Sequence, residues 1–248
     1  DRIYDAVFRE YGVHRARTPE EFLDVAYAAS HGKMPTNRRV AVLTTSGGMG
    51  VHAADFLAEA NLELPAIDEK TQRELLKLAP YGAVGNPVDT TAQFVNAPQL
   101  LNDMLKLVLD TDRFDTVLTL LAHAAISPQL APKLLAAMAP IAEKYPGKLL
   151  AIAMAAPDEV LTDFRNAGFL VFEDLGRAAI ALGALVNFSE AFGRLEAMDR
   201  NEPAAGPETL GSALNEWQAK QLLARHGIGL PPERIVGDAG AASAAAVE

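Results

Sequence analysis

The chain has 248 residues, of which 50% are hydrophobic and 22% are charged, a balance that excludes an intrinsically disordered protein and predicts a packed core. Its net charge of −10, without a basic stripe, argues against nucleic acid as a partner, and its lack of cysteine excludes disulfides, thiolate catalysis and cysteine-based metal sites. Because no apolar run approaches ~18 residues and the first residues do not resemble a signal peptide, we expect a cytoplasmic protein with no membrane partner.

The first part of the chain predicts two helices that lead into a larger domain. Residues 1–12 place apolar side chains on one helical face and end at a glycine. The sequence TPEE at 18–21 is a capping box with proline at the first helical position, and it predicts a second helix to about His31. We therefore expect residues 1–36 to pack as leading helices on the domain that follows.

From Arg39 onward, short apolar runs alternate with helical periods, which is typical of a parallel sheet with crossover helices. The predicted strands are Val40–Thr44, Leu62–Ile67, Val117–Ala122, Leu149–Met154 and Phe169–Phe172. Helices are predicted over about 50–60, 68–79, 97–110, 128–144, 158–167 and 174–198. This order predicts an α/β fold over residues 37–200, a flavodoxin-like, doubly wound and mainly parallel sheet that binds ligands at the carboxyl ends of its strands.

The composition changes again at NEPAAGPETLGS, residues 201–212, which predicts a linker. A new amphipathic helix is predicted from about Ala213 to His226, followed by a short strand at Arg234–Val236. The final AGAASAAAVE begins another helix. We therefore expect residues 213–248 to be the incomplete start of a second domain.

A glycine-rich turn, TTSGGMG at residues 44–50, follows the first core strand and begins a helix. Glycine lets backbone N–H groups approach a phosphate closely, while the helix dipole favours negative charge. A strand-to-helix turn that needs glycine only for packing would have the same sequence. On the motif alone, both interpretations stay open.

The same turn also matches a nicotinamide-binding pattern. Gly48, Gly50 and Ala53 satisfy G-x-G-x-x-A, and Asp68 lies near the end of the second predicted strand. Together these are the Rossmann fingerprint with its ribose-binding acid. A single match of this kind has low specificity, so binding of NAD is kept as an alternative.

Polar residues elsewhere are less specific. Asn86 and Asp89 lie in the loop GNPVDTT, which suits either a substrate-facing loop or an ordinary Asn-Pro turn. The five histidines lack the spacing of a metal site, so no metal ligand is expected. His123 follows a predicted strand, where a structural role is favoured over a catalytic one.

The residues from 39 to 80, RVAVLTTSGGMGVHAADFLAEANLELPAIDEKTQRELLKLAP, and the loop GNPVDTT resemble the NDP-forming acyl-CoA synthetase family. That family contains the single-chain relatives of succinyl-CoA ligase and of ADP-forming acetyl-CoA synthetase. The opening DRIYDAVFREYGVHRARTPEEFLDVA also resembles the family, and LNEWQAKQLLARHGIGLPPERIVGDAGAASAAA is similar to the entry of its ATP-grasp domain. Residues 115–198 match in layout only.

The resemblance implies an acid–CoA ligase, in which an acid, ATP and CoA become acyl-CoA, ADP and phosphate through an acyl phosphate and a phosphorylated histidine. It implies that the following residues face the phosphohistidine loop or line its pocket: Ser46, Gly47, Gly48, Met49, Gly50, Asn86 and Asp89. ATP, Mg²⁺ and CoA would be cofactors of the full-length enzyme, and none is expected to bind fully to this chain. The implied partners are a small carboxylic acid and the CoA-binding, phosphohistidine and ATP-grasp domains of the same polypeptide, and a homo-oligomer is compatible with the sequence.

The sequence also departs from the family pattern. The Ser-His-Thr-Gly motif with the phosphorylated histidine would lie upstream of Asp1, and the residues that grip nucleotide and Mg²⁺ would lie after Glu248. No catalytic residue is therefore assigned within this chain, and we expect the chain alone to be inactive. An alternative from a different class is a noncatalytic ligand-sensing module of the kind fused to protein acetyltransferases.

Overall fold

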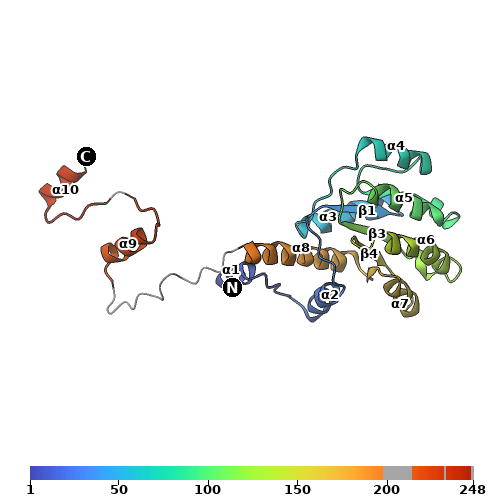
Figure 1. Ribbon diagram of the computed structural model, residues 1–248, viewed down its shortest axis with the longest axis horizontal. Helices are drawn as coiled ribbons and strands as arrows, with labels where there is room; N and C mark the ends of the chain where they lie inside the picture. The colour runs from blue at the N-terminus through green and yellow to red at the C-terminus, as the bar shows by residue number, and fades with distance from the viewer. Residues whose placement is uncertain (198–213, 232, 247–248) are drawn as a thin grey trace. The chain divides into compact units, whose positions relative to one another are not determined.

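The computed structural model describes residues 1–197, 214–231 and 233–246, and the chain divides into two compact units, Asp1–Met198 and Asp199–Glu248 (Figure 1). The first unit contains the whole sheet and the helices around it. The second unit is described separately below. The predicted linker at 201–212 lies outside the described residues.

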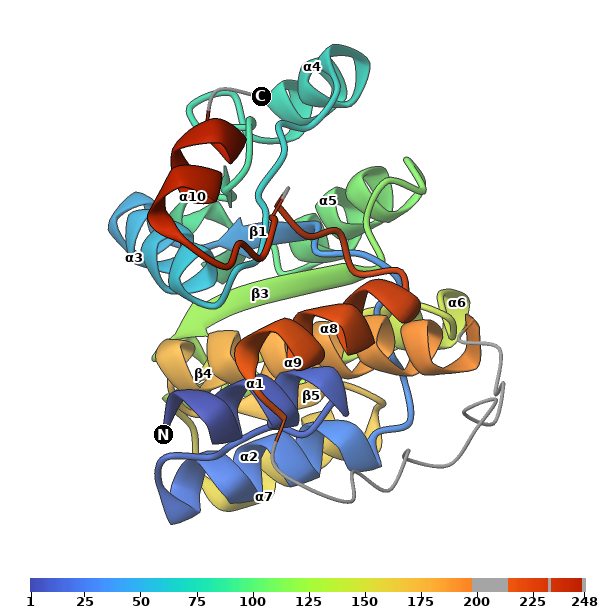
Figure 2. The same ribbon diagram turned by 90° about the vertical axis from the view of Figure 1, so that its left-hand side faces the viewer.

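The first unit is built on a five-stranded sheet whose strands are all parallel, in the order β2-β1-β3-β4-β5. The strands are β1 (Val40–Thr44), β2 (Val88–Asp89), β3 (Thr116–Ala122), β4 (Leu149–Met154) and β5 (Leu170–Phe172). The long strand β3 lies between β1 and β4 (Figure 2). This is the flavodoxin-like order, so the predicted fold class is confirmed.

One predicted strand was wrong. Leu62–Ile67 contributes only an isolated bridge between Arg39 and Glu63, and the strand beside β1 is instead Val88–Asp89, after the next helix. Pro65 within the apolar run has no N–H group to donate to a neighbouring strand. The segment therefore runs as an extended connection into the following helix.

Helices cover both faces of the sheet. One face carries α2 (Pro19–Ser30), α3 (Gly47–Glu59) and α8 (Leu175–Ala197), while the other carries α4 (Glu69–Leu78), α5 (Gln99–Leu109), α6 (Ala131–Lys144) and α7 (Asp158–Asn166). Single 3-10 turns follow two strands, η1 (Ala92–Val95) after β2 and η2 (Ala124–Ile126) after β3. The pattern is the three-layer arrangement that a buried parallel sheet requires.

The two cores follow from the alternation of side chains along each strand. In β1, Ala41 and Leu43 pack in the core beneath α5 and α6, whereas Val40 and Val42 pack beneath α3 and α8. All five residues of this strand are buried. A strand buried on both faces reads as a continuous apolar run, which is why its boundaries were predictable.

The leading helices differ in how they attach to this core. The carboxylate of Asp24 on α2 accepts two hydrogen bonds from Arg177 on α8, each 2.7 Å long, and the hydroxyl of Tyr27 accepts a 3.0 Å bond from the backbone of Val171. By contrast α1 (Arg2–Glu10) has no buried residue. The turn that follows it meets α8 at Gly12, where a Cβ atom would lie 2.6 Å from Cβ of Ala191.

By length and composition, the stretch Leu175–Leu195 of α8 is apolar enough to cross a membrane. Within the domain, however, 56% of that stretch is buried against α2, α3 and the sheet. A core helix of an α/β domain meets the same criteria, and the packing of α8 is that of a core helix.

The second unit contains two short helices, α9 (Glu216–Arg225) and α10 (Ala239–Ala245). Asn215 and Gln218 form a reciprocal capping box at the start of α9. The predicted strand at Arg234–Val236 is wrong, because those residues have no regular secondary structure. A strand needs a partner for its backbone groups, and none pairs with it in the described part of this unit.

The stability of the domain is expected to depend on pH through a histidine at the end of α2. His31 lies there half-buried, its Nε2 atom has no hydrogen-bond partner among the described residues, and burial together with nearby Lys33 lowers its pKa. The folded protein therefore disfavours the protonated ring, so the stabilising effect of neutral His31 is complete above the unfolded pKa of about 6.5. It is lost as pH falls below that value.

We expect the urea midpoint to fall between pH 7.5 and pH 5.5, and to fall less in His31→Gln, which cannot titrate. The same substitution at exposed His52 on α3 is the control. Equal pH dependence in wild type and His31→Gln would contradict this role.

Candidate functional site

The glycine-rich turn lies at the carboxyl end of β1, where α3 begins at Gly47. Ser46, Gly47 and Gly48 are exposed, Met49 is half-buried and Gly50 is buried. The predicted strand, turn and helix therefore occur in the predicted order. This end of a parallel sheet is where α/β proteins bind ligands.

Two threonines fix the backbone of the turn. The Thr44 hydroxyl accepts a 3.1 Å hydrogen bond from the Ser46 N–H group and donates a 2.8 Å bond to the Ser46 carbonyl. The Thr44 carbonyl in turn accepts from both the N–H group and the hydroxyl of Thr90, at 2.8 and 3.1 Å. Both threonines are buried, and neither was singled out from the sequence, because a threonine at the end of a strand has no distinctive pattern.

The first turn of α3 presents unpaired donors. The Gly50 N–H group donates to the Ser46 carbonyl, but the N–H groups of Gly47, Gly48 and Met49 have no acceptor within the described residues, and the Ser46 side chain does not cap the helix. Unpaired N–H groups at a helix N-terminus carry a partial positive charge. This arrangement can bind an anionic group.

The three glycines of the turn meet different surroundings. A Cβ atom at Gly50 would lie 3.2 Å from atoms of Pro87 and Thr44, so this glycine is closely packed. At Gly48 the nearest atom would be the Ser46 hydroxyl oxygen at 4.0 Å. Packing therefore explains Gly50 and leaves Gly48 without a packing role.

Asp89 brings a carboxylate to the same place. It lies at the end of β2, its Oδ1 atom accepts a 2.8 Å hydrogen bond from the Thr91 N–H group, and its Oδ2 atom would be 3.2 Å from a Cβ atom at Gly47. The site thus combines backbone donors with one half-exposed acceptor. Such a pair matches a ligand that both accepts and donates hydrogen bonds.

Asn86 has a different task from the one expected. Its Oδ1 atom accepts from the Val42 N–H group at 3.0 Å, and its amide nitrogen donates to the carbonyls of Val40 and Pro65 at 2.9 and 3.0 Å. The side chain lies along the middle of β1, where it pairs with backbone groups that no strand reaches. Both amide N–H groups are used inside the domain, so we assign Asn86 to structure.

The acid of the NAD-binding pattern is also placed differently. Asp68 does not end a strand but caps α4, where its side chain accepts a 3.0 Å hydrogen bond from the Thr71 N–H group. That bond lowers the pKa of Asp68. A capping carboxylate at the start of α4 is occupied by the helix, which removes the ribose-binding acid from the Rossmann pattern.

Two further expectations concern histidines and metals. His123 is exposed, directly after β3 and before η2. No group of three or more histidine or acidic side chains is arranged for a metal ion within the described ranges. The candidate site is therefore the α3 turn with Asp89.

The proteins that this chain resembles include ligases that use CoA. Residues 40–160 match the Ligase-CoA domain family. The α subunit of the ADP-forming acetate–CoA ligase II of Pyrococcus furiosus is 42% identical over 92 residues, which are 37% of this chain and 20% of that protein. A trans-feruloyl-CoA synthase of an unknown prokaryotic organism is 26% identical over 242 residues, which are 95% of this chain and 34% of that protein.

Among solved structures, the dinucleotide forming acetyl-coenzyme A synthetase 1 of Ca. Korarchaeum cryptofilum superposes with a TM-score of 0.67 at 23% identity, over 80% of this chain and 44% of that chain. This likeness concerns the fold. The present chain spans less than half the length of each of these relatives. Residues 40–160 therefore form a Ligase-CoA domain, and the comparisons support a partial chain of an ADP-forming acyl-CoA synthetase.

Proposed function

We propose that this chain is the sheet domain of a longer acid–CoA ligase, which joins a carboxylic acid to CoA while ATP is cleaved to ADP and phosphate. The names of its relatives support an enzyme of this class, since they include ADP-forming acetate–CoA ligases. Within that reaction, we assign to this chain the binding of a phosphoryl group during its transfer.

The observation that carries this proposal is the set of unpaired N–H groups at Gly47, Gly48 and Met49. Transfer of a phosphoryl group depends on positioning and on stabilisation of negative charge. Backbone donors that are fixed before the reaction stabilise such charge without having to reorganise. The hydrogen bonds of Thr44 and Thr90 provide this fixation.

Asp89 makes the site suited to a phosphohistidine in particular. A phosphohistidine side chain has phosphoryl oxygens that accept hydrogen bonds, and its second ring nitrogen donates one when the ring is protonated, a form that a neighbouring carboxylate favours. The N–H groups of α3 would meet the phosphoryl oxygens, and the Asp89 carboxylate would accept from the ring. A free phosphate would gain nothing from the carboxylate, whose charge would repel it.

The remaining steps belong to other parts of the polypeptide in this proposal. ATP, Mg²⁺ and CoA would bind to the CoA-binding and ATP-grasp domains, and the histidine would be carried by a further domain. Residues 213–248 would begin the ATP-grasp domain. The enzyme would act in the cytoplasm, on a small carboxylic acid.

The test compares the intact polypeptide with the 248-residue chain, using ATP, CoA and a panel of short carboxylic acids that includes acetate. We expect the intact protein to form acyl-CoA and ADP in equal amounts, and the chain alone to form neither. Release of AMP in place of ADP would contradict the proposed reaction. Acid or CoA binding by the intact protein without any product would instead favour the sensing module.

A further inference from the structure

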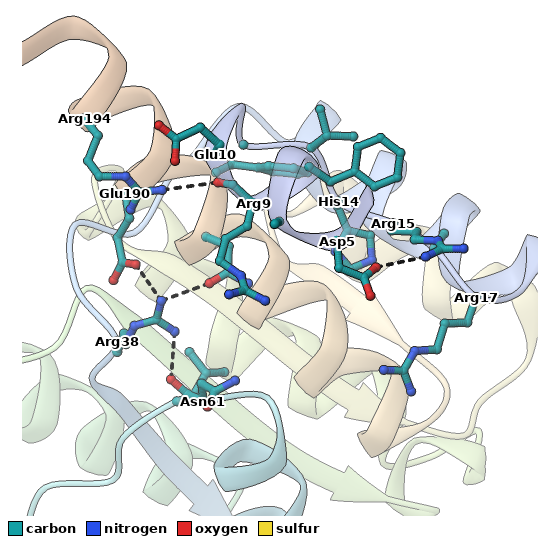
Figure 3. Close-up of a pocket in the computed structure, with 18 of the residues that line it drawn as sticks. Asp5, Arg9, Glu10, His14, Arg15, Arg17, Arg38, Asn61, Glu190 and Arg194 are labelled. Carbon is teal, nitrogen blue, oxygen red and sulfur yellow. Dashed lines mark hydrogen bonds and ion pairs between the residues drawn. The ribbon is translucent and has the colours of Figure 1, made fainter. Parts of the chain in front are cut away.

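A second concave feature lies away from the α3 turn. It is a groove of about 1660 Å³, bordered by α1, residues 12–17, residues 58–63 and the last turns of α8 (Figure 3). Arg38 and Glu63, which line it, stand beside the start of β1, whereas the α3 turn follows the end of that strand. The groove and the α3 turn are therefore at opposite edges of the sheet.

Five carboxylates and five arginines line this groove, and the arginines come from four separate segments. They are Arg9, Arg15, Arg17, Arg38 and Arg194. The guanidinium group is a planar fork that matches carboxylate and phosphate oxygens in pairs. No lysine is among the lining residues.

Two of the arginines are held by partners within the domain. Arg15 donates to Asp5 at 2.9 Å and to Asp1 at 3.3 Å. Arg38, which is half-buried, donates to the Asn61 carbonyl and to side chains of α8. These groups form the walls of the groove and keep little capacity for a ligand.

Arg9 and Arg17 are different. Within the described residues their guanidinium groups have no hydrogen-bond or ion-pair partner, and Figure 3 shows both side chains extending into the groove that Arg38 borders. Arg194 makes a single long bond of 3.5 Å to the Arg9 carbonyl. The side chains of Arg9 and Arg17 are exposed, and a bound anion would accept charge-assisted hydrogen bonds from their guanidinium groups.

The backbone that carries Arg9 and Arg17 is fixed on both sides. The turn at Gly12 packs on Ala191, and His14 bonds through Nε2 to Glu21 of α2 at 2.8 Å while its ring meets Phe188 of α8 edge-on. The Arg17 N–H group donates to the Glu21 carboxylate at 3.0 Å. The two free guanidinium groups thus project from an anchored segment, which lowers the entropy lost when they bind a ligand.

We propose that this groove binds a polyphosphate, either inorganic or as the phosphate chain of a nucleotide, with Arg9 and Arg17 as its ligands. The groove is larger than a single inorganic ion needs, and two separate forks suit a chain of phosphates better than one carboxylate. This site is independent of the phosphoryl-transfer site on α3.

Three of the five lining carboxylates pair with Arg15 or Arg38, and the other two oppose an anionic ligand. The side chains of Glu10 and Glu63 have no ion-pair partner in the part of the chain that the structure describes, and both are exposed. If the groove binds an anion, removal of the Glu63 charge should strengthen binding. A groove without an anionic ligand would show no such effect.

The experiment titrates the 248-residue chain with inorganic triphosphate by calorimetry at low and at physiological ionic strength. We expect binding that weakens with salt, a loss of about tenfold in affinity for Arg9→Gln and for Arg17→Gln, and tighter binding for Glu63→Gln. Arg73→Gln, at an exposed arginine of α4 outside the groove, is the matched control and should change nothing. Thermal unfolding checks that each variant is folded.

Further titrations with pyrophosphate, ADP and adenosine distinguish the two sources of the phosphate chain, since ADP binding tighter than pyrophosphate would indicate a nucleotide and equal binding a free polyphosphate. Absence of binding, or binding that Arg73→Gln weakens as much as Arg9→Gln does, would overturn the inference. Binding that is lost in a Gly48→Leu variant and kept in the arginine variants would also overturn it, because the anion would then occupy the α3 turn.

Discussion

Replacing Gly48 with leucine is expected to reduce phosphoryl transfer in the intact ligase by roughly 100-fold or more while leaving its thermal stability unchanged or higher. Loss of one preorganised donor in an enzyme site costs about 10²–10³ in rate, and a leucine side chain would cover the N–H groups of the first turn. The fold should tolerate the change, because a Cβ atom at this position meets nothing closer than 4.0 Å. Leucine also favours a helix over glycine, by roughly 0.8 kcal/mol.

Gly193→Leu is the matched control for this experiment. Gly193 is also a helical glycine with nothing within 4 Å of its Cβ position, but it lies near the end of α8, away from the α3 turn. Transfer is measured as the label that the histidine acquires from γ-labelled ATP, and stability as the unfolding temperature. If Gly48→Leu unfolded at a lower temperature and still transferred phosphate at the normal rate, the turn would be a packing device and not a site.

The sequence allowed the sheet to be predicted wherever a strand is buried on both faces. The strands β1 and β4 have the predicted boundaries, because a strand buried on both faces of a parallel sheet is a nearly continuous apolar run in the sequence. The strand β2 has only two residues, Val88 and Asp89, and its neighbour Asn86 supplies the backbone pairing of β1 with side-chain atoms. No sequence pattern distinguishes such a strand from a polar loop.

Only part of the candidate site could be predicted, because its other features depend on contacts between segments that are distant in sequence. The glycines of the turn are visible as a motif, but which of them serves packing depends on the contacts of Pro87, which comes from a distant part of the chain. The arginines of the groove come from segments that are separate in sequence and show no spacing to connect them. Their convergence appears only when α1 and α8 are placed beside the start of β1.

Substituting alanine for Gly82 is expected to destabilise the domain by about 2–3 kcal/mol, in the range typical of overpacked cores. A Cβ atom there would lie 2.1 Å from the Asp89 carbonyl oxygen and 3.4 Å from Cβ of Ala79, so the backbone at the end of β2 would have to move. The backbone N–H group of Asp89 also donates to the Ala83 carbonyl at 2.7 Å, which leaves little freedom for relaxation. For a domain of this size, the unfolding temperature should fall by roughly 5–10 °C.

Gly85→Ala in the same loop is the control. It tests whether replacement of any glycine in this loop destabilises the domain, or only replacement of the closely packed Gly82. A Cβ atom at Gly85 meets nothing within 4 Å, and neither glycine has a positive φ, so alanine is compatible with both backbone conformations. We expect Gly85→Ala to leave the unfolding temperature unchanged or to raise it slightly, through loss of freedom in the unfolded chain.

Because movement of β2 would also displace the Asp89 carboxylate, Gly82→Ala should impair phosphoryl transfer in the intact ligase even at temperatures where the variant is folded. Equal stability of the two variants would contradict the close packing of Gly82 against β2, and normal transfer by folded Gly82→Ala would show that the position of Asp89 does not matter to the site.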